Sequence, residues 1–314
     1  MIVAQGLAKR FGALAAVDGV SLNVVAGEVL GFLGPNGAGK TTTMRMLAGF
    51  LEPTAGSASI AGFDVVHQPI EARRRMGYVP EGAPLYGDMS VTGFLGFVAE
   101  VRGFRGAEKA RRIERVVELV SLATVADRPI ETLSKGFKRR VGLAQSMLHD
   151  PPVLILDEPT DGLDPNQKHH VRTLIGKMAK DKAIIVSTHI LEEVDAVCTR
   201  AIVIADGRIV ADGTADDLLS RLPGHNTVVV SVDPRSADAA RVALAPVAGR
   251  MPSQTASDGY VVFRVPAEAG VSRLAGVTEA LKRAGVTAHS VVVERGRLED
   301  AFQRLTTSPT GGRV

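Results

Sequence analysis

The sequence contains little cysteine, few aromatic side chains and no long apolar run. Its one cysteine, Cys198, excludes an intramolecular disulfide and a cysteine-rich metal cluster, which favours a reducing compartment such as the cytoplasm. No apolar run approaches the roughly 20 residues that a membrane-spanning helix needs. The first residues also lack the basic and apolar segments of a secretory signal. We therefore expect a cytoplasmic protein that reaches a membrane only through a partner.

Nucleic acid is not an expected partner. Aromatic residues make up 4% of the chain and tryptophan is absent, so the sequence indicates no surface on which bases stack. The formal net charge is +3, from 37 basic and 34 acidic residues that are interspersed along the chain. With 314 residues, 45% hydrophobic and 23% charged, the chain has the composition of a globular protein and the length of about two domains.

The first two thirds of the chain alternate strand and helix patterns. The apolar runs 153–156 and 183–186 are continuous, which is typical of strands buried on both faces of a parallel sheet. Residues 91–103 and 107–121 have apolar side chains at helical spacing, which predicts a helical insert between strands. This alternation indicates an α/β domain.

The pattern restarts after a hairpin that we predict around Asp206-Gly207. Turn-forming residues cluster at 222–226, so we place the first domain at residues 1–220 and a small α+β domain at residues 225–305, with a disordered tail at 306–314. The predicted strands of the second domain are 227–232, 259–265 and 288–293, and its predicted helices are 236–244, 271–284 and 298–305.

A glycine-rich loop joins a predicted strand at residues 28–33 to a predicted helix at residues 41–49. Its sequence, Gly34-Pro35-Asn36-Gly37-Ala38-Gly39-Lys40-Thr41, matches the phosphate-loop pattern G-x-x-x-x-G-K-[ST] in the required context. In such a loop, backbone N–H groups surround the β-phosphate, Lys40 reaches the β- and γ-phosphates, and the Thr41 hydroxyl binds Mg²⁺. The loop therefore predicts a nucleoside triphosphate site.

Two carboxylates and a histidine follow the predicted buried strands. Asp157 and Glu158 end the strand that begins at Val153, where an open parallel sheet places its ligands. We expect Asp157 to hold Mg²⁺ through water and Glu158 to accept a proton from the water that attacks the γ-phosphate. His189 closes the strand 184–188 and is placed to bond the γ-phosphate. Solvated acids at a strand end are the alternative interpretation.

The segment Leu133-Ser134-Lys135-Gly136-Phe137 lies shortly before these carboxylates. It resembles the Leu-Ser-Gly-Gly-Gln signature of ATP-binding cassette (ABC) ATPases, and the surrounding motifs match that family over about residues 1–220. Ser134 is a good helix N-cap, and with Gly136 it can face the γ-phosphate of a nucleotide held by another subunit. By this resemblance, Phe11 stacks on adenine, Glu81 occupies the Q-loop position, Gly162-Leu163-Asp164 is the D-loop and His189 is the switch histidine.

Two departures from the family pattern indicate a subgroup. Lys135 and Phe137 replace the usual Gly and Gln of the signature, and Glu81 replaces the usual glutamine of the Q-loop. Both variants resemble those of type-two ABC exporters, including the ATPases associated with bacterial gliding-motility systems. The C-terminal segment, which ends in Leu298-Glu299-Asp300-Ala301-Phe302, resembles the accessory domain that some of these ATPases carry.

The resemblance implies a fold, a function and a set of site residues. The fold is α/β, a P-loop NTPase ABC nucleotide-binding domain with a RecA-like core, an antiparallel β subdomain and a helical subdomain, followed by a small C-terminal α+β domain. The function is ATP binding and hydrolysis in a homodimer or heterodimer that drives transport by separate transmembrane permease subunits at the inner face of the cell membrane. The implied ligands are ATP and Mg²⁺. Catalysis is assigned to Glu158, His189 and Lys40, ATP binding to Phe11, Gly34, Asn36, Gly37, Ala38, Gly39, Lys40, Thr41, Thr42, Ser134, Gly136 and Asp164, and Mg²⁺ binding to Thr41, Glu81 and Asp157.

A soluble ABC ATPase that acts on DNA or ribosomes is the alternative function. Such proteins usually carry paired cassettes, long coiled-coil insertions or zinc modules, whereas this sequence has a single cassette and one cysteine. A GTPase is a further alternative, but the sequence contains no Asn-Lys-x-Asp guanine-reading motif. These features favour the transporter subunit.

Other segments carry expectations outside the nucleotide site. Residues 81–89 join the core to the helical insert, and the apolar, exposed character of residues 83–86 suits a groove for a cytoplasmic helix of the membrane subunit. The basic runs 73–75 and 138–140 are interpreted as solvated faces, with phosphate or partner contact as the alternative. Residues 225–305 carry no catalytic motif and are interpreted as a regulatory or dimer-supporting module.

Overall fold

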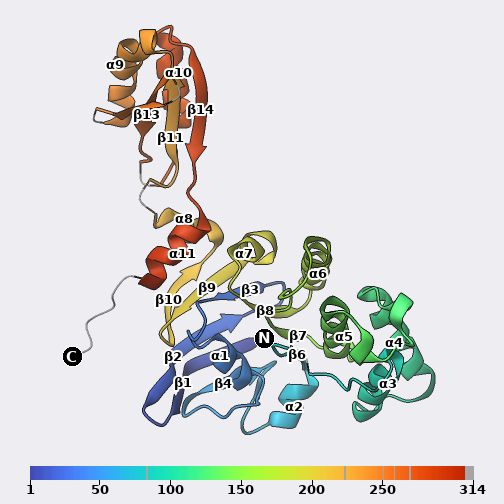
Figure 1. Cartoon of the computed structure of the whole chain (residues 1–314). Helices are drawn as coiled ribbons and strands as arrows, with labels where there is room; N and C mark the ends of the chain where they lie inside the picture. Colours follow the sequence, from blue (N-terminus) through green and yellow to red (C-terminus); the bar gives the residue numbers. More distant parts are fainter. Residues whose placement is uncertain (83, 223, 250, 258, 269, 308–314) are drawn as a thin grey trace. The chain divides into compact units, whose positions relative to one another are not determined.

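The computed structural model describes residues 1–82, 84–222, 224–249, 251–257, 259–268 and 270–307 (Figure 1). The chain divides into two compact units, Met1–Thr214 and Ala215–Val314. The division falls at Thr214 rather than at the predicted position of about 220, because helix α8 (Ala215–Ser220) packs against helix α11 (Leu298–Thr307) of the second unit.

A mixed sheet forms the centre of the first unit. Its strand order is β10-β9-β3-β8-β7-β6, and all neighbours are parallel except the hairpin of β9 and β10. The runs predicted as doubly buried strands become β7 and β8, in which every residue is buried. The predicted hairpin turn is also present, with positive φ at Asp206 and Gly207. The strands are β3 (Val29–Leu33), β6 (Met76–Val79), β7 (Val153–Asp157), β8 (Ala183–Thr188), β9 (Arg200–Ala205) and β10 (Arg208–Gly213).

An antiparallel sheet packs beside the central sheet (Figure 1). One apolar core joins the two sheets, with Ile2 from the antiparallel sheet, Phe32 and Ile185 from the central sheet, and Met44 from the helix that follows the glycine-rich loop. This packing holds the loop between the sheets. The elements are β1 (Ile2–Phe11), β2 (Leu14–Val24), α1 (Lys40–Leu47), β4 (Ala55–Ile60), β5 (Phe63–Asp64) and α2 (Pro69–Arg74).

A helical region continues from the β6 edge of the central sheet. Helix α5 packs on β6, and α3 and α4 pack on α5 (Figure 1). A second apolar core fills this region and includes Phe94, Leu95 and Leu143. None of the helices within the described ranges is long and apolar enough to cross a bilayer. The elements of this region are α3 (Val91–Val101), α4 (Gly106–Leu119), η1 (Ala123–Val125), η2 (Ile130–Thr132) and α5 (Lys135–Met147). Helices α6 (Pro165–Met178) and α7 (Leu191–Val197) pack against each other, and α7 also packs on β3 and β8.

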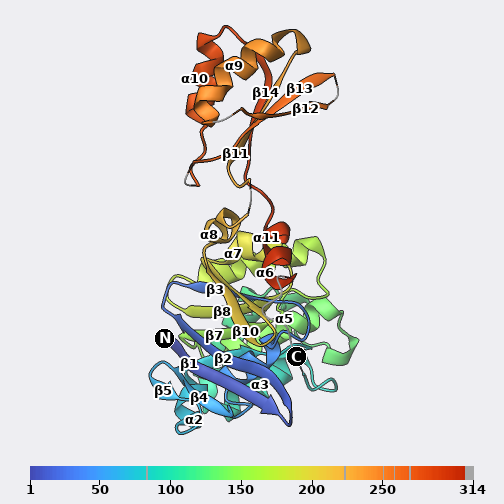
Figure 2. The same cartoon turned by 90° about the vertical axis from the view of Figure 1, so that its left-hand side faces the viewer.

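The second unit contains a βαββαβ unit with an antiparallel sheet of order β12-β13-β11-β14, which is the ferredoxin-like arrangement. Helices α9 and α10 lie side by side and pack on one face of the sheet, around Val230, Leu244 and Phe263 (Figure 2). The elements are β11 (Thr227–Val232), η3 (Pro234–Ser236), α9 (Ala237–Ala248), β12 (Ser253–Ser257), β13 (Tyr260–Val265), α10 (Leu274–Arg283) and β14 (Ala288–Glu294).

Strand β12 was not expected from the sequence, and the last helix is longer than expected. Helix α11 begins at Leu298 as predicted but extends to Thr307, so the first two residues of the predicted disordered tail are helical. The hydroxyl of Thr306 donates to the carbonyl oxygen of Phe302 and continues the helical turn. The rest of the predicted tail, residues 308–314, lies outside the described residues.

A half-buried histidine makes the first unit sensitive to acid. His149 follows α5, and its Nε2 lies 3.1 Å from the carbonyl oxygen of Met76. Burial lowers the pKa of His149 from 6.5 to about 4, and the positive charge of Arg102 acts in the same direction. The unfolded chain therefore takes up a proton at higher pH than the folded chain does, so stability is lost as the pH falls from 6.5 towards 4.

We expect His149→Gln to remove this component of the pH dependence. Between pH 7 and pH 4.5 the wild-type chain should lose about 2 to 3 kcal/mol more unfolding free energy than the variant. Urea denaturation of both proteins at the two pH values measures this difference, with His170→Gln, at an exposed position, as the control. Equal losses in wild type and His149→Gln would show that His149 is not the responsible group.

Candidate active site

The glycine-rich loop connects the end of β3 to the start of α1. Gly39 precedes α1 with φ +103°, in the left-handed region that favours glycine. A Cβ atom at Gly39 would lie 2.5 Å from the carbonyl oxygen of Ala16, and one at Gly34 would lie 2.5 Å from that of Ile204. Neighbouring backbone thus requires glycine at both ends of the loop, and the N–H groups at the start of α1 remain available for an anion.

A cavity of about 430 Å³ opens beside this loop, and we call it the nucleotide cavity. Its walls come from the loop, from α1, from the segment after β6 and from the ends of β7 and β8. Ala16 and Asp161 were not expected here, because no motif marks Ala16 and Asp161 lies between the residues that the motifs select. The lining residues are Ala16, Asn36, Gly37, Gly39, Lys40, Thr41, Thr42, Glu81, Glu158, Asp161 and His189.

Lys40 lies at the base of the cavity and is held by its own loop. Its Nζ donates to the carbonyl oxygens of Gly34 at 2.8 Å and Pro35 at 3.2 Å, and lies 3.9 Å from Glu158 Oε1. Burial lowers the pKa of Lys40, and the charges of Glu158 and Asp157 oppose that shift. The loop and these acids therefore keep a cationic group pointed at the place where phosphates would bind.

Glu158 and His189 meet across the cavity. Glu158 Oε2 lies 2.9 Å from His189 Nδ1, with the glutamate side chain 14% exposed and the histidine side chain 46% exposed. Glu158 has φ +49°, and its backbone N–H donates to the carbonyl oxygen of Ser187 at 3.2 Å and to its hydroxyl at 3.0 Å. Strand β8 thus fixes the unusual backbone that points this carboxylate into the cavity.

Asp157 lies behind Glu158 and is fully buried. The Ser187 hydroxyl donates to its Oδ1, whereas its Oδ2 has no hydrogen-bond partner among the described residues. A buried carboxylate oxygen without a donor is costly unless a cation or water completes it. Asp157 therefore fits a hydrated Mg²⁺, whereas Glu81 and Thr41 approach from the cavity wall.

The other predicted site residues do not line this cavity. Phe11 is half exposed at the end of β1, with the Lys9 ammonium group 5.6 Å from its ring centroid. Ser134 caps α5 by accepting from the Phe137 N–H at 3.4 Å. Asp164 caps α6 by accepting from the Gln167 N–H at 2.9 Å. Gly34, Ala38, Gly136 and Asp157 complete the set of predicted residues outside the lining.

The basic run 138–140 is not a solvated face throughout, so that expectation is wrong for Arg139. Its side chain is 6% exposed, and its Nη1 donates to the carbonyl oxygen of Pro80 at 3.3 Å. Burial lowers the pKa of Arg139, and the charges of Asp161 and Glu158 oppose that shift. Through Arg139, the buried face of α5 therefore contacts the segment that follows β6.

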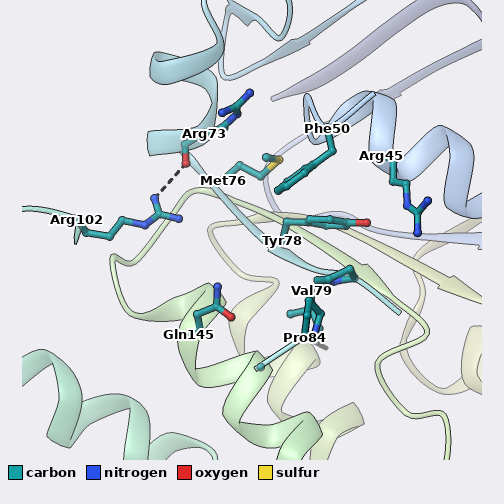
Figure 3. Close-up of a pocket in the computed structure, with 11 residues that line it drawn as sticks. Arg45, Phe50, Arg73, Met76, Tyr78, Val79, Pro84, Arg102 and Gln145 are labelled. Carbon is teal, nitrogen blue, oxygen red and sulfur yellow. Dashed lines mark hydrogen bonds between the residues drawn. The ribbon is translucent and has the colours of Figure 1, made fainter. Parts of the chain in front are cut away.

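A second cavity of about 520 Å³ lies where α1, α2, β6 and α5 meet. Figure 3 shows the Tyr78 and Phe50 rings at its centre and the guanidinium groups of Arg45, Arg73 and Arg102 around them. A smaller cavity of about 300 Å³ shares Pro84, Arg102 and Gln145 with it and is lined further by Tyr86, Phe94, Phe97, Val98 and Val101. We call the two together the Tyr78 groove.

The segment expected to be exposed and apolar lies along this groove. Pro84 and Tyr86 are exposed and line it, but Leu85 packs against the core of the helical region, so the expected exposure is wrong for Leu85. Ala83 lies outside the described residues. Arg73 lines the groove while Arg74 pairs with Glu71, so only one of these two exposed arginines faces the groove.

Known proteins resemble the chain over nearly its whole length. Residues 17–161 match the family model described as ABC transporter. The chain is 35% identical over 303 residues to the Nod factor export ATP-binding protein I of Ralstonia nicotianae, covering 96% of this chain and 92% of that protein. It is 36% identical over 309 residues to the daunorubicin resistance ATP-binding protein DrrA3 of Streptomyces coeruleorubidus, covering 97% and 95%.

A solved structure shows the same architecture. The structure of an ATP binding subunit of an ABC transporter superposes with a TM-score of 0.65 and 32% identity, covering 69% of this chain and 91% of that one. On the sequence and structural evidence together, the chain belongs to the ABC transporter family, as an ATP-binding ATPase subunit.

Proposed function

We propose that this chain hydrolyses ATP with Glu158 as the general base and thereby drives export through separate transmembrane subunits. The observation that carries the assignment of the base is the nucleotide cavity, which brings Lys40 and Thr41 of the phosphate loop beside the Glu158–His189 contact. The direct test is steady-state phosphate release from MgATP by the full-length chain, compared with the Glu158→Gln variant.

We assign phosphate binding and proton transfer to different residues of the cavity. The N–H groups at the start of α1 and the Lys40 ammonium group bind the β- and γ-phosphates. The Glu158 carboxylate takes the proton of the attacking water, which raises the nucleophilicity of that water. His189 contacts Glu158 through its Nδ1, and we assign it a bond to the γ-phosphate because it lines the same cavity as Lys40.

We assign Mg²⁺ binding to Thr41, Asp157 and Glu81. The support is the buried Asp157 Oδ2, which has no hydrogen-bond partner in the described part of the chain. When bound, the ion would neutralise negative charge on the phosphates. Oxygen ligands of this kind suit Mg²⁺, which usually keeps several waters.

We infer that two such subunits, identical or different, close around ATP. Ser134 and Gly136 lie at the start of α5 and outside the nucleotide cavity, which agrees with a site that serves a nucleotide on another subunit. The N-terminus of α5 favours a negatively charged ligand. We assign residues 225–305 to regulation or support of this dimer, because they carry neither a glycine-rich phosphate loop nor paired carboxylates beside a histidine.

We infer that the transmembrane partner docks in the Tyr78 groove, which places the chain at the inner face of the cell membrane. Two relatives named for export and for drug resistance support a transport role. The groove exposes the aromatic rings of Phe50, Tyr86 and Phe97, and apolar grooves of this kind receive amphipathic helices. Its arginines favour a helix that carries carboxylates.

We expect Arg73→Glu to uncouple the chain from its membrane partner. The reversed charge would face the carboxylates of the docking helix and should lower partner affinity about tenfold or more. Basal ATP hydrolysis should stay within about twofold of wild type, because Arg73 does not line the nucleotide cavity. Co-purification from membranes and phosphate release measure the two quantities separately.

Arg74→Glu is the matched control, because Arg74 is adjacent and exposed but pairs with Glu71 and does not line the groove. It should leave partner affinity unchanged. Equal loss of partner binding in both variants would indicate a general charge effect. Equal loss of binding and basal hydrolysis in Arg73→Glu would indicate damage to the fold, and either result would count against docking in the groove.

A further inference from the structure

Glu193 is a buried carboxylate that the known motifs leave unassigned. It lies on α7 and is 4% exposed, whereas its neighbour Glu192 on the same helix is exposed. Burial of a charged carboxylate costs several kcal/mol unless hydrogen bonds and a counter-charge compensate for the lost water. The contacts of Glu193 must therefore account for its place in the fold.

Both oxygens of Glu193 accept hydrogen bonds. The Thr160 hydroxyl donates to Oε1, and the Thr188 hydroxyl donates to Oε2 at 2.8 Å. Arg172 Nη2 lies 3.7 Å from Oε1 and supplies the counter-charge from α6. Thr160, Thr188 and Glu193 are all buried, so water does not compete with these bonds. The three side chains form a closed network, which we call the Glu193 network.

The two threonines belong to the segments that carry the reacting side chains. Thr160 follows Glu158 by two positions, in the turn after β7, and Thr188 directly precedes His189. The Thr188 hydroxyl also accepts from the backbone N–H of Ile190 at 3.0 Å, so it fixes the backbone on both sides of His189. Glu193 therefore links the backbone of the base to the backbone of the histidine.

We propose that Glu193 is a positioning residue for ATP hydrolysis, an inference that rests on the proposed roles of Glu158 and His189. It fixes the position of the turn after β7 relative to the end of β8, and this fixed position maintains the 2.9 Å contact between Glu158 Oε2 and His189 Nδ1. A displacement of about 1 Å in a catalytic group can lower a rate about 100-fold. Within the described residues, the hydrogen bonds and the ion pair of Glu193 go to Thr160, Thr188 and Arg172, and none of these belongs to the phosphate loop. We therefore expect its effect on the rate and not on ATP affinity.

The first test is Glu193→Gln in the full-length chain. The amide replaces one acceptor oxygen by an NH2 donor, so one threonine hydroxyl can no longer donate to this side chain, and Arg172 loses its counter-charge. We expect kcat for ATP hydrolysis to fall about 10- to 100-fold while KM for MgATP stays within about twofold of wild type. Glu192→Gln removes the same charge from the exposed neighbouring position and should leave both constants unchanged.

Threonine variants separate positioning from general loss of structure. Thr160→Val and Thr188→Val keep the side-chain shape but remove the hydroxyl, so each should lower kcat as Glu193→Gln does. Thr160→Ser and Thr188→Ser keep the hydroxyl and should retain at least half of the wild-type kcat. A merely structural role would make the serine variants as defective as the valine variants, because both lose a buried methyl group or a buried bond.

An unchanged kcat in Glu193→Gln would overturn the proposal. So would a fall in kcat that is matched by an equal loss of MgATP affinity, or valine variants with normal rates. If Glu193→Gln does not fold, the threonine pairs decide alone, by the presence or absence of serine rescue. Full activity of Glu158→Gln would instead refute the proposed base, and an inactive Glu158→Gln beside a normal Glu193→Gln would refute only the positioning role.

Discussion

Glu158→Gln should bind ATP but turn it over about 10²- to 10⁴-fold more slowly than the wild-type chain. The amide keeps the shape of the side chain and cannot accept the proton of the attacking water. The phosphate loop and Lys40 are unchanged, so ATP and Mg²⁺ should remain bound and hold two subunits together. Phosphate release measures the rate, and gel filtration with ATP and Mg²⁺ measures the dimer.

The control for this variant is Glu192→Gln, at an exposed position of α7. It should hydrolyse ATP at the wild-type rate and should not accumulate as a dimer. A Glu158→Gln protein that stays monomeric with saturating ATP, and also in the presence of its membrane partner, would rule out the nucleotide-sandwich dimer. Hydrolysis at the wild-type rate would show that another group accepts the proton.

Lys40→Ala should lose about 100-fold in affinity for ATP. We assign the ammonium group charge-assisted bonds to two phosphates, which together would contribute about 3 kcal/mol. The same group also donates to the carbonyl oxygens of Gly34 and Pro35 in its own loop, so its replacement removes an internal contact as well. Titration calorimetry with MgATP measures the affinity, and thermal melting checks that the chain is folded.

Lys177→Ala is a suitable control, because Lys177 lies on the exposed surface of α6. It carries the same change of charge and should bind ATP with wild-type affinity. A folded Lys40→Ala protein with unchanged affinity would show that the backbone of the loop alone holds the phosphates. That result would assign the phosphate-binding free energy to the backbone N–H groups and not to the Lys40 side chain.

Much of the first unit could be predicted because its strands are strongly marked. Residues 153–156 and 183–186 are continuous apolar runs, and in the structure β7 and β8 are buried on both faces. Strand β12 could not be predicted in this way. Its residues, Ser253–Ser257, are mostly polar, and in the described part of the sheet they form the edge strand, paired with β13 alone. Backbone pairing, and not apolar burial, makes it a strand.

The site residues that belong to short sequence motifs could be predicted, whereas those whose position depends on tertiary packing could not. The phosphate loop, Glu158 and His189 are marked by their spacing and do line one cavity. Glu193 carried no such mark, because an acid on a short helix is ordinarily solvated and its partners lie 33 and 5 positions away in sequence. Arg139 was misplaced for the same reason, since burial against Pro80 depends on how α5 packs.

Adjacent residues after β6 face different cavities. Pro80 lines the Tyr78 groove and Glu81 lines the nucleotide cavity, so an occupant of either cavity acts on one short piece of backbone. Thermodynamic linkage makes any such effect reciprocal. The factor by which a docked partner increases the affinity for ATP equals the factor by which bound ATP increases the affinity for the partner. Titration of either ligand in the presence of the other therefore measures a single coupling free energy. If a partner binds with the same affinity in the presence and absence of ATP, the coupling free energy through this segment is zero.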